Sequence, residues 1–255
     1  MSFYDHFAAD EQPFVKRAMD WIQRSEDRYQ TVRTDFLDPR EQFILDSLVA
    51  KNEELRCETF GGYEEAERVR ALLLPAYIKD DDFGLALFHL DYPKKFATVD
   101  HPQLLGSLIG LGIKREKIGD LLFVDDLIQF IVADEVADYI QLNLTRVGRT
   151  SVTCVREPMQ RIIQPRLNWE QAAGTVASLR IDTVIAEIFR LSRAKATALV
   201  TGGTVKVNWR TVEKPAFEVK AGDHLSVRGY GRSRLVAIGA KTRRGSRHIE
   251  YEKLK

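Results

Sequence analysis

The sequence predicts an α+β protein with a mainly helical N-terminal part, a ferredoxin-like middle part and a basic C-terminal module. Apolar side chains recur at helical spacing in residues 1–75, strand and helix signals alternate in residues 76–158, and two short helices precede a small β-unit in residues 180–255. Residues 159–179 are predicted to be a connector, because a residue that precedes proline, such as Gln164, favours extended backbone.

The N-terminal part is predicted from helix-start signals and apolar spacing. A first helix is expected over Glu11–Arg24. Asp38 and Glu41 have the spacing of a capping box, which predicts that a second helix begins there. Leu55–Phe60 is expected to be a strand, and the charged segment Tyr63–Leu74 is expected to be a third helix.

Six segments of the middle part follow the order β-α-β-β-α-β. The expected strands are Phe83–Asp91, Ile118–Val124, Leu127–Val132 and Thr150–Val155, and the expected helices are Pro102–Leu111 and Glu135–Thr145. This order is the ferredoxin-like plan, which RNA-recognition motifs share, so the middle part is also RRM-like.

RNA contact by the middle part stays open at this point. Phe88, Phe123 and Phe130 are candidates for base-stacking aromatics, but the basic, glycine-containing run of RNA-recognition motifs is absent, so we expect no base-stacking platform of the usual kind. Basic residues in two loops are candidates for secondary RNA contacts or for plain solvated lysines and arginines. These are Lys94, Lys95, Lys114, Arg115 and Lys117.

Charge divides the chain sharply. Residues 180–255 hold 17 Lys and Arg against 7 Asp and Glu, whereas residues 1–179 hold 21 of the 38 basic residues and 30 of the 37 acidic ones. A polyanion would therefore be attracted to the C-terminal module first, which favours nucleic acid as the partner over a merely solvated basic face.

The cysteine spacing, the N-terminal residues and the lengths of the apolar runs argue against a disulfide scaffold, a zinc site and a membrane span. Cys57 and Cys154 lie far apart without a CxxC motif, so we expect neither a disulfide scaffold nor a zinc site, and no cofactor. The N-terminus lacks a signal-peptide pattern, and no run of about 18 apolar residues predicts a membrane span. The expected location is the cytoplasm, with a monomer expected and the oligomeric state left open.

The basic module is predicted from its helix starts. Asp182 at the start of the helix Thr183–Phe189 is expected to cap free amides. Ser192 is expected to cap a second helix whose first turn carries Arg193 and Lys195, next to amides that attract phosphate. The predicted phosphate contacts are Arg190, Arg193, Lys195, Lys206, Arg210, Arg228, Arg232 and Arg234. Asn208 and Trp209 are candidates for base or sugar contacts, and packing is an equal alternative for Trp209.

Residues 180–231 resemble the S4 RNA-binding domain. The matching positions are Arg180, Asp182, Ser192, Arg193, Gly203, Val205, Val207, Asn208, Gly222 and Asp223. Ile181 stands where the family has Leu, and Trp209 stands where it has Gly, which leaves the geometry of the following loop and the role of Arg210 open. With these motif positions, the predicted RNA-binding residues are Arg180, Asp182, Arg190, Ser192, Arg193, Lys195, Lys206, Asn208, Arg210, Arg228, Arg232 and Arg234.

The whole chain resembles the YlmH-type S4 proteins of Gram-positive bacteria. The resemblance is carried by Asp38-Pro39-Arg40-Glu41-Gln42 and Phe60-Gly61-Gly62-Tyr63-Glu64-Glu65-Ala66-Glu67-Arg68, besides the S4 pattern. It implies a cytoplasmic RNA-binding protein, often encoded beside cell-division genes. It also implies binding to ribosomal RNA of the large ribosomal subunit, with or without peptidyl-tRNA, in the rescue of stalled translation.

Enzymes that carry S4 domains are the main alternative. A pseudouridine synthase needs an Asp in a G-R-L-D-type run, and Thr145–Arg149 lacks it. A methyltransferase needs a glycine-rich cofactor loop after a strand, whereas Gly106–Gly112 reads as a helix end. No nucleotide-binding signature of a tyrosyl-tRNA synthetase is present. The sequence thus favours a non-enzymatic RNA-binding protein without catalytic residues over an RNA-modifying enzyme or a division scaffold.

Overall fold

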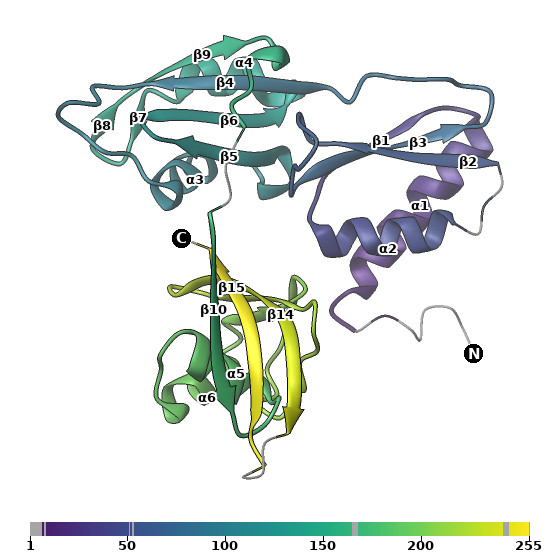
Figure 1. The fold of residues 1–255 in the computed structure, drawn as a ribbon. Helices are drawn as coiled ribbons and strands as arrows, with labels where there is room; N and C mark the ends of the chain where they lie inside the picture. The colour runs from purple at the N-terminus through teal and green to yellow at the C-terminus, as the bar shows by residue number, and fades with distance from the viewer. Residues whose placement is uncertain are drawn as a thin grey trace. The chain divides into compact units, whose positions relative to one another are not determined.

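The chain forms two compact units, Met1–Pro165 and Arg166–Lys255 (Figure 1). The computed structural model describes residues 7, 9–50, 52, 54–164, 168–241 and 245–254. Within these ranges no helix has the length and apolarity needed to cross a membrane.

The N-terminal segment of the first unit combines two helices with a three-stranded antiparallel sheet. Its elements are α1 (Gln12–Arg28), β1 (Val32–Leu37), α2 (Pro39–Val49), β2 (Leu55–Phe60) and β3 (Val69–Pro75). The sheet order is β1-β3-β2, and both helices share one apolar core with it. The predicted capping box is confirmed: Asp38 accepts from the Arg40 and Glu41 amides, and Glu41 accepts from the Asp38 amide.

The predicted helix over Tyr63–Leu74 is wrong, because β3 runs through its second half as the central strand. All seven residues of β3 are buried. A central strand covered on both faces loses the alternation that marks a half-exposed strand, and its apolar run then also fits one face of a helix. For the same reason β1, where Phe36 and Leu37 are both buried, was not predicted as a strand.

The ferredoxin-like plan of the middle segment is confirmed. Its elements are β4 (Leu85–Asp91), α3 (His101–Gly110), β5 (Ile118–Val124), β6 (Leu127–Ala133), α4 (Ala137–Asn143) and β9 (Thr153–Glu157), with a short hairpin of β7 (Arg146–Val147) and β8 (Thr150–Ser151). The sheet is antiparallel in the order β5-β6-β4-β9. Asp100 and Gln103 form a capping box that starts α3.

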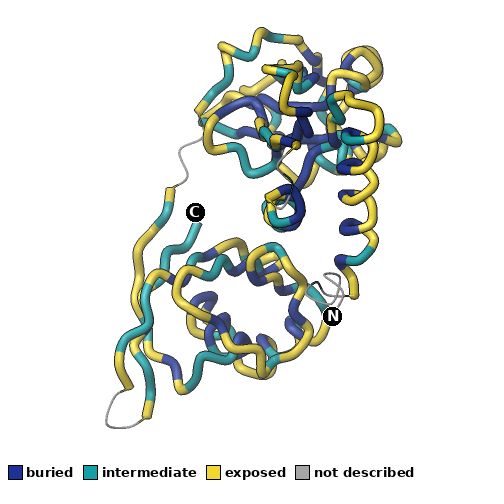
Figure 2. Tube along the Cα trace, turned by 90° about the vertical axis from the view of Figure 1, so that its right-hand side faces the viewer, coloured by how far each residue is buried: buried dark blue, intermediate teal, exposed yellow. Residues whose placement is uncertain are grey.

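Apolar side chains cover both faces of this sheet, and Figure 2 shows buried and exposed residues interspersed along the chain trace. Phe88 and Phe130 stack with ring centroids 5.3 Å apart in the core beneath α3 and α4, and neither is exposed to solvent. On the other face, Leu87 and Ile131 pack against Phe36 of β1. Because the aromatics point into one core and the opposite face is buried in another, this sheet offers no surface on which bases can stack in the RRM manner.

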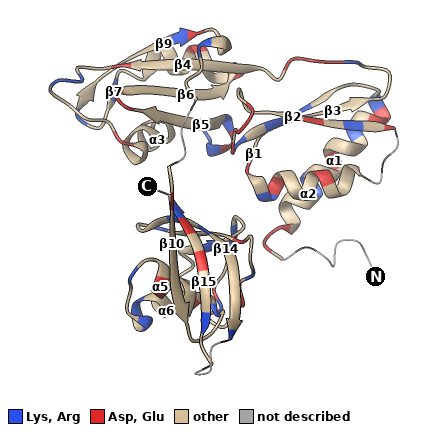
Figure 3. Cartoon of the chain, viewed as in Figure 1, with Lys and Arg blue, Asp and Glu red and all other residues tan. Residues whose placement is uncertain are grey.

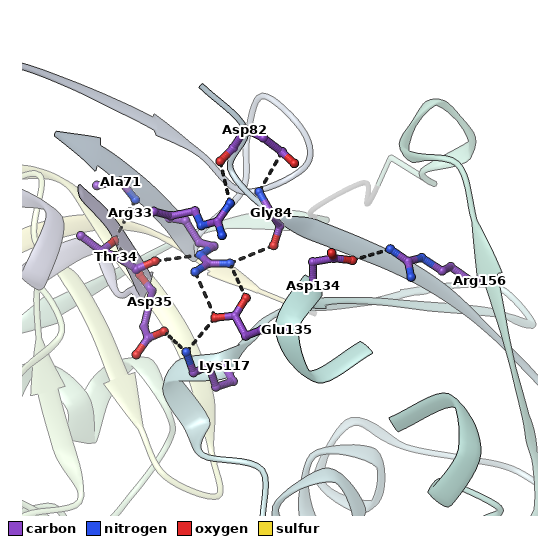
Figure 4. Close-up of polar contacts among 11 residues, drawn as sticks. Arg33, Thr34, Asp35, Ala71, Asp82, Gly84, Lys117, Asp134, Glu135 and Arg156 are labelled. Carbon is purple, nitrogen blue, oxygen red and sulfur yellow. Dashed lines mark hydrogen bonds and ion pairs between the residues drawn. The ribbon is translucent and has the colours of Figure 1, made fainter. Parts of the chain in front are cut away.

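A buried polar network joins the two segments of the first unit (Figure 4). The Arg70 guanidinium of β3, only 2% exposed, donates to the Thr34 carbonyl at 2.7 Å, the Gly84 carbonyl at 2.8 Å and the Glu135 carboxylate at 3.0 Å. Lys117 adds an ion pair with Glu135 at 2.7 Å. Burial alone would raise the pKa of Glu135, but the hydrogen bonds from Lys117 and Arg70 outweigh it and lower the pKa to about 2.

We expect Glu135 to make the first unit sensitive to acid. Its pKa is depressed in the folded state, so its contribution to stability is complete above the ordinary value of 4.5 and is lost as the pH falls towards 2. Glu135→Gln should lower the free energy of unfolding at neutral pH and flatten its decline in that range. Urea unfolding between pH 6 and pH 3 measures this, with the exposed Glu64→Gln as control; equal pH slopes in all three proteins would contradict it.

The second unit is one antiparallel sheet of six strands with two helices on one face. Its elements are β10 (Trp169–Val176), α5 (Ile181–Ile188), α6 (Arg193–Thr201), β11 (Val205–Val207), β12 (Arg210–Thr211), β13 (His224–Val227), β14 (Gly231–Lys241) and β15 (Arg247–Leu254). The order is β10-β15-β14-β13-β11-β12. The predicted connector is corrected at β10, which pairs along its whole length with β15 and forms an edge of the sheet.

Candidate nucleic-acid interface

Asp182 links the starts of the two helices in the second unit. Its carboxylate accepts two hydrogen bonds from the Arg180 guanidinium, at 3.1 and 3.0 Å. It also accepts from Arg193 and from the Thr197 hydroxyl of α6, each at 3.4 Å. The side chain of Asp182 is 3% exposed, whereas those of Arg180 and Arg193 are 39% and 54% exposed. A buried anion thus holds two solvent-facing cations side by side.

The expectation that Asp182 caps helix amides is wrong. The N-cap of α5 is Arg180, and no side chain makes a cap hydrogen bond there. Burial would raise the pKa of Asp182, but the hydrogen bond from Arg180 and the charges of Arg193 and Arg180 lower it, so the group stays ionised at neutral pH. Because its oxygens accept from protein donors, Asp182 holds the two arginines in position, and its place among the RNA-binding residues stays a prediction.

The predicted cap at the start of α6 is confirmed. Ser192 is the N-cap, and its hydroxyl accepts from the Lys195 amide at 3.3 Å. Arg193 and Lys195 are exposed in the first turn. The Lys195 ammonium lies 5.3 Å from the centre of the Tyr230 ring, an arrangement that holds the cation near an aromatic face.

Arg190 occupies a left-handed backbone position, φ +53°, directly after α5. The amides of Arg190 and Leu191 close the turn by bonding to the carbonyls of Glu187 and Ala186, as in a Schellman motif. Glycine is the usual residue at this position, because other residues are strained there. Arg190 therefore places a cation at the turn between the helices, and the strained backbone there lowers stability relative to glycine.

Lys253 is a basic residue on this side that the sequence prediction missed. Its ammonium lies 5.3 Å from the centre of the Phe189 ring, and Phe189 in turn meets Tyr230 with ring centres 6.4 Å apart. The sequence does carry a signal for Lys253, because alternate residues of a strand share a face. Ile249, Tyr251 and Lys253 therefore lie on the same face of β15 as the helices. We define Arg180, Arg190, Arg193, Lys195 and Lys253 as the helix-side basic group.

We expect Arg190→Gly to separate stability from binding. Glycine relieves the left-handed strain, so the free energy of unfolding should stay equal or rise by about 0.5–1 kcal/mol. RNA affinity should fall several-fold, because a phosphate contact is lost. Thermal unfolding and RNA titration of the same protein measure both, and Arg190→Lys is the matched control that keeps the charge. A glycine variant with unchanged affinity would remove Arg190 from the interface.

Other predicted cations lie on the opposite face of the sheet. Lys206 of β11 pairs with Ser226, and Ser226 pairs with Arg232, so these three share one face; His224 likewise pairs with Arg234. Their neighbours along the strands, such as Leu225 of β13, point into the core under the helices. Figure 3 shows Lys and Arg both beside the helices and on the strands of this unit. The predicted contacts are thus divided between two surfaces, with Arg210 and Arg228 exposed on the edge strand and in the β13–β14 turn.

The tight turn between β11 and β12 keeps its geometry despite the absence of glycine. Asn208 and Trp209 have φ values of +47° and +64°, as the two central residues of a type I′ hairpin require. The Asn208 side chain donates to Asp223 and accepts from the His224 amide, both at 2.8 Å. Asn208 therefore ties two loops together, and its contact with a base or sugar stays a prediction.

The basic residues of the first unit that are candidates for secondary RNA contacts form two groups, one exposed and one bound to protein partners. Lys94, Lys95 and Lys114 are exposed. Lys117, in contrast, pairs with Asp35 and Glu135, and the Arg115 guanidinium donates to the Ile118 carbonyl at 2.6 Å.

Burial and the nearby Arg68 lower the pKa of Arg115 to about 10, which marks it as a half-buried group. Both Arg115 and Lys117 are bound to protein partners that sequence spacing does not reveal, and their contact with RNA stays a prediction. The structure adds Phe96, which is 90% exposed immediately after Lys94 and Lys95.

The described residues include neither a cluster that fits a metal ion nor an activated cysteine thiol. Among them, no three His, Cys, Asp or Glu side chains gather in a way that fits a metal ion. Cys57 and Cys154 are free, and burial raises the pKa of each thiol to about 12, so neither is an activated nucleophile.

Comparisons with family models match three successive parts of the chain: the N-terminal segment, the ferredoxin-like segment and the S4 domain. Residues 10–78 match the family model described as the N-terminal domain of YlmH, residues 79–161 match a putative RNA-binding domain in YlmH, and residues 179–225 match the S4 domain.

Two relatives extend the likeness over the chain. The chain is 41% identical over 254 residues to the ribosome-associated protein quality control protein P2 of Bacillus subtilis, which covers 99% of this chain and 98% of that protein. A solved structure of the cell division protein ylmH from Streptococcus pneumoniae matches with a TM-score of 0.55 and 31% identity, over 64% of this chain and 100% of that one. The chain therefore belongs to the YlmH family of S4-domain RNA-binding proteins.

Proposed function

We propose that the protein docks on structured RNA through the helix-side basic group of its S4 domain. The observation that carries this proposal is the pair of exposed arginines, Arg180 and Arg193, held at fixed positions by the buried Asp182. Cations that are ordered before binding lose less side-chain entropy when they meet phosphates than free side chains do. Such contacts set affinity and its dependence on salt without reading sequence.

The RNA in this proposal is ribosomal RNA of the large ribosomal subunit, with or without peptidyl-tRNA. The name of the Bacillus subtilis relative, a ribosome-associated quality control protein, supports this RNA and a role in the rescue of stalled translation. The name of the Streptococcus pneumoniae relative supports a link to cell division. The protein acts in the cytoplasm, as a monomer and without catalysis, and Lys94, Lys95 and Lys114 supply secondary contacts.

Sedimentation with purified ribosomal subunits tests the proposal. The wild-type chain should sediment with the large subunit, and the double variant Lys195→Glu/Lys253→Glu should remain at the top of the gradient, because reversed charges repel the phosphates. Lys16→Glu, on the exposed face of α1, is the matched control and should bind like the wild type. Equal binding of the double variant would show that another surface makes the contact.

Experiments in cells distinguish our proposal from two other functions, RNA modification and a scaffold role in division. If the protein modifies RNA, mass mapping of ribosomal RNA from a deletion strain should reveal one missing modification. If it is a division scaffold, a chain that lacks residues 180–255 should still restore the deletion strain. Our proposal predicts a complete set of modifications and a failure of the shortened chain.

A further inference from the structure

The outer face of the S4 sheet, opposite α5 and α6, carries aromatic rings and cations next to each other. The centres of the Trp209 and His224 rings lie 5.2 Å apart at an angle of 33°, and the His224 and Trp169 rings meet in a T-shaped arrangement with centres 6.4 Å apart. The Arg234 guanidinium lies 5.7 Å from the centre of the Trp169 ring. Strand pairing adds Lys206 and Arg232 to the same face.

The backbone at Trp209 is unusual for such a large residue. A φ of +64° is easily adopted by glycine, whereas a bulky aromatic residue there is strained. The Asn208 side chain holds the turn to Asp223 and to the His224 amide, and the indole lies against the His224 ring. Residues with strained backbone are concentrated at binding sites, which makes the Trp209 ring a candidate ligand contact.

We propose that this face binds unpaired nucleotides, with one base stacked on Trp209 beside His224 and the neighbouring phosphates contacted by Lys206 and Arg232. Aromatic rings that alternate with cations are the usual means of binding single-stranded RNA without reading its sequence. Glu252, whose carboxylate accepts from Arg234 at 2.5 Å, fixes that guanidinium over Trp169 and leaves less of its charge for phosphate. The inference rests on the proposed RNA-binding function, since it assigns a second RNA class to the same domain.

Two RNA probes and the full-length chain test this site. One probe is a labelled single-stranded oligouridine, and the other is a blunt RNA hairpin. Trp209→Gly should weaken binding of the oligouridine about 10-fold, which corresponds to the loss of one stacked base, and should leave hairpin binding within about twofold. Trp209→Phe, which keeps an aromatic face, should retain most of the oligouridine affinity.

Controls separate stacking from folding. Trp209→Gly relieves a left-handed position, so its thermal unfolding midpoint should equal or exceed that of the wild type. Tyr29→Gly is the matched control, because Tyr29 is an exposed aromatic residue at φ +50° in the acidic part of the chain. It should leave the affinity for both RNAs unchanged.

The outcomes distinguish this inference from the proposed function. Unchanged oligouridine binding by Trp209→Gly, an equal loss for both RNAs, or a wild-type chain that binds only the hairpin would each overturn the single-strand site while docking on structured RNA stands. A wild-type chain that binds neither RNA would overturn both proposals. Loss confined to the oligouridine would support the site.

Discussion

Replacing Asp182 with alanine should weaken RNA binding even though it makes the S4 domain more basic. Arg180, Arg193 and Thr197 would lose their common acceptor, so the two guanidinium groups would no longer be held in place. We expect the affinity for structured RNA to fall about tenfold and the free energy of unfolding of this unit to fall by about 2 kcal/mol, the range for hydrogen bonds to a charged group. RNA titration and urea unfolding measure the two effects.

The sign of the affinity change decides between positioning and general electrostatics. If long-range attraction alone governed binding, removal of any carboxylate from this domain would raise the affinity. Glu213→Ala is the matched control, because it removes an exposed carboxylate of the same domain and should leave the affinity equal or slightly higher. An Asp182→Ala protein that binds more tightly than the wild type would contradict the positioning role.

Replacing Arg70 with alanine should destabilise the first unit strongly. The residue is 2% exposed, and its guanidinium donates to the Thr34 and Gly84 carbonyls and to the Glu135 carboxylate. Without it, Gly84 keeps the Asp134 amide and Glu135 keeps Lys117 as donors, whereas the Thr34 carbonyl loses the buried guanidinium. A buried acceptor that loses its donor costs about 1–3 kcal/mol, and the space left by the side chain adds to this, so we expect a loss of about 3 kcal/mol. Urea unfolding monitored by near-UV circular dichroism measures the change.

The neighbouring Arg33 provides the control for this prediction. Its guanidinium donates to the Asp82 carbonyl at 2.9 Å, but the residue is exposed, so Arg33→Ala should change stability by no more than about 0.5 kcal/mol. RNA affinity of a folded Arg70→Ala protein should be unchanged, because the S4 domain is a separate compact unit. A loss below about 1 kcal/mol for Arg70→Ala would mean that water or other donors replace the guanidinium.

Local signals predicted the order of elements in the middle segment and two of the helix starts. Ser192 and Asp38 precede their helices at the spacing that capping needs, and a side-chain oxygen close to the amides it serves is a property of the sequence itself. The strands of the ferredoxin-like segment were predicted because turns with Asp and Gly separate them. Strand β3 was not, because burial on both faces removes the alternation that identifies a strand.

Contacts between distant residues were beyond the sequence prediction. Asp182 sits at a helix start, where capping is the local expectation, yet its partner Thr197 is 15 residues away on α6. Lys117 looks like a loop lysine until β1 brings Asp35 beside it. The division of the S4 cations between two faces likewise depends on strand register, since a shift by one residue would move Lys206 to the helix side.

The salt dependence of binding by Arg193→Ala tests the central claim most directly. The affinity of the full-length chain for the large ribosomal subunit is measured over about 50–200 mM KCl, and the logarithm of the affinity is plotted against the logarithm of the salt concentration. If Arg193 contacts a phosphate, the slope for Arg193→Ala should be smaller than that of the wild type by about one, whereas Lys16→Ala should follow the wild-type line. Parallel lines for the wild type and Arg193→Ala would contradict the claim that the cations held by Asp182 bind the RNA backbone.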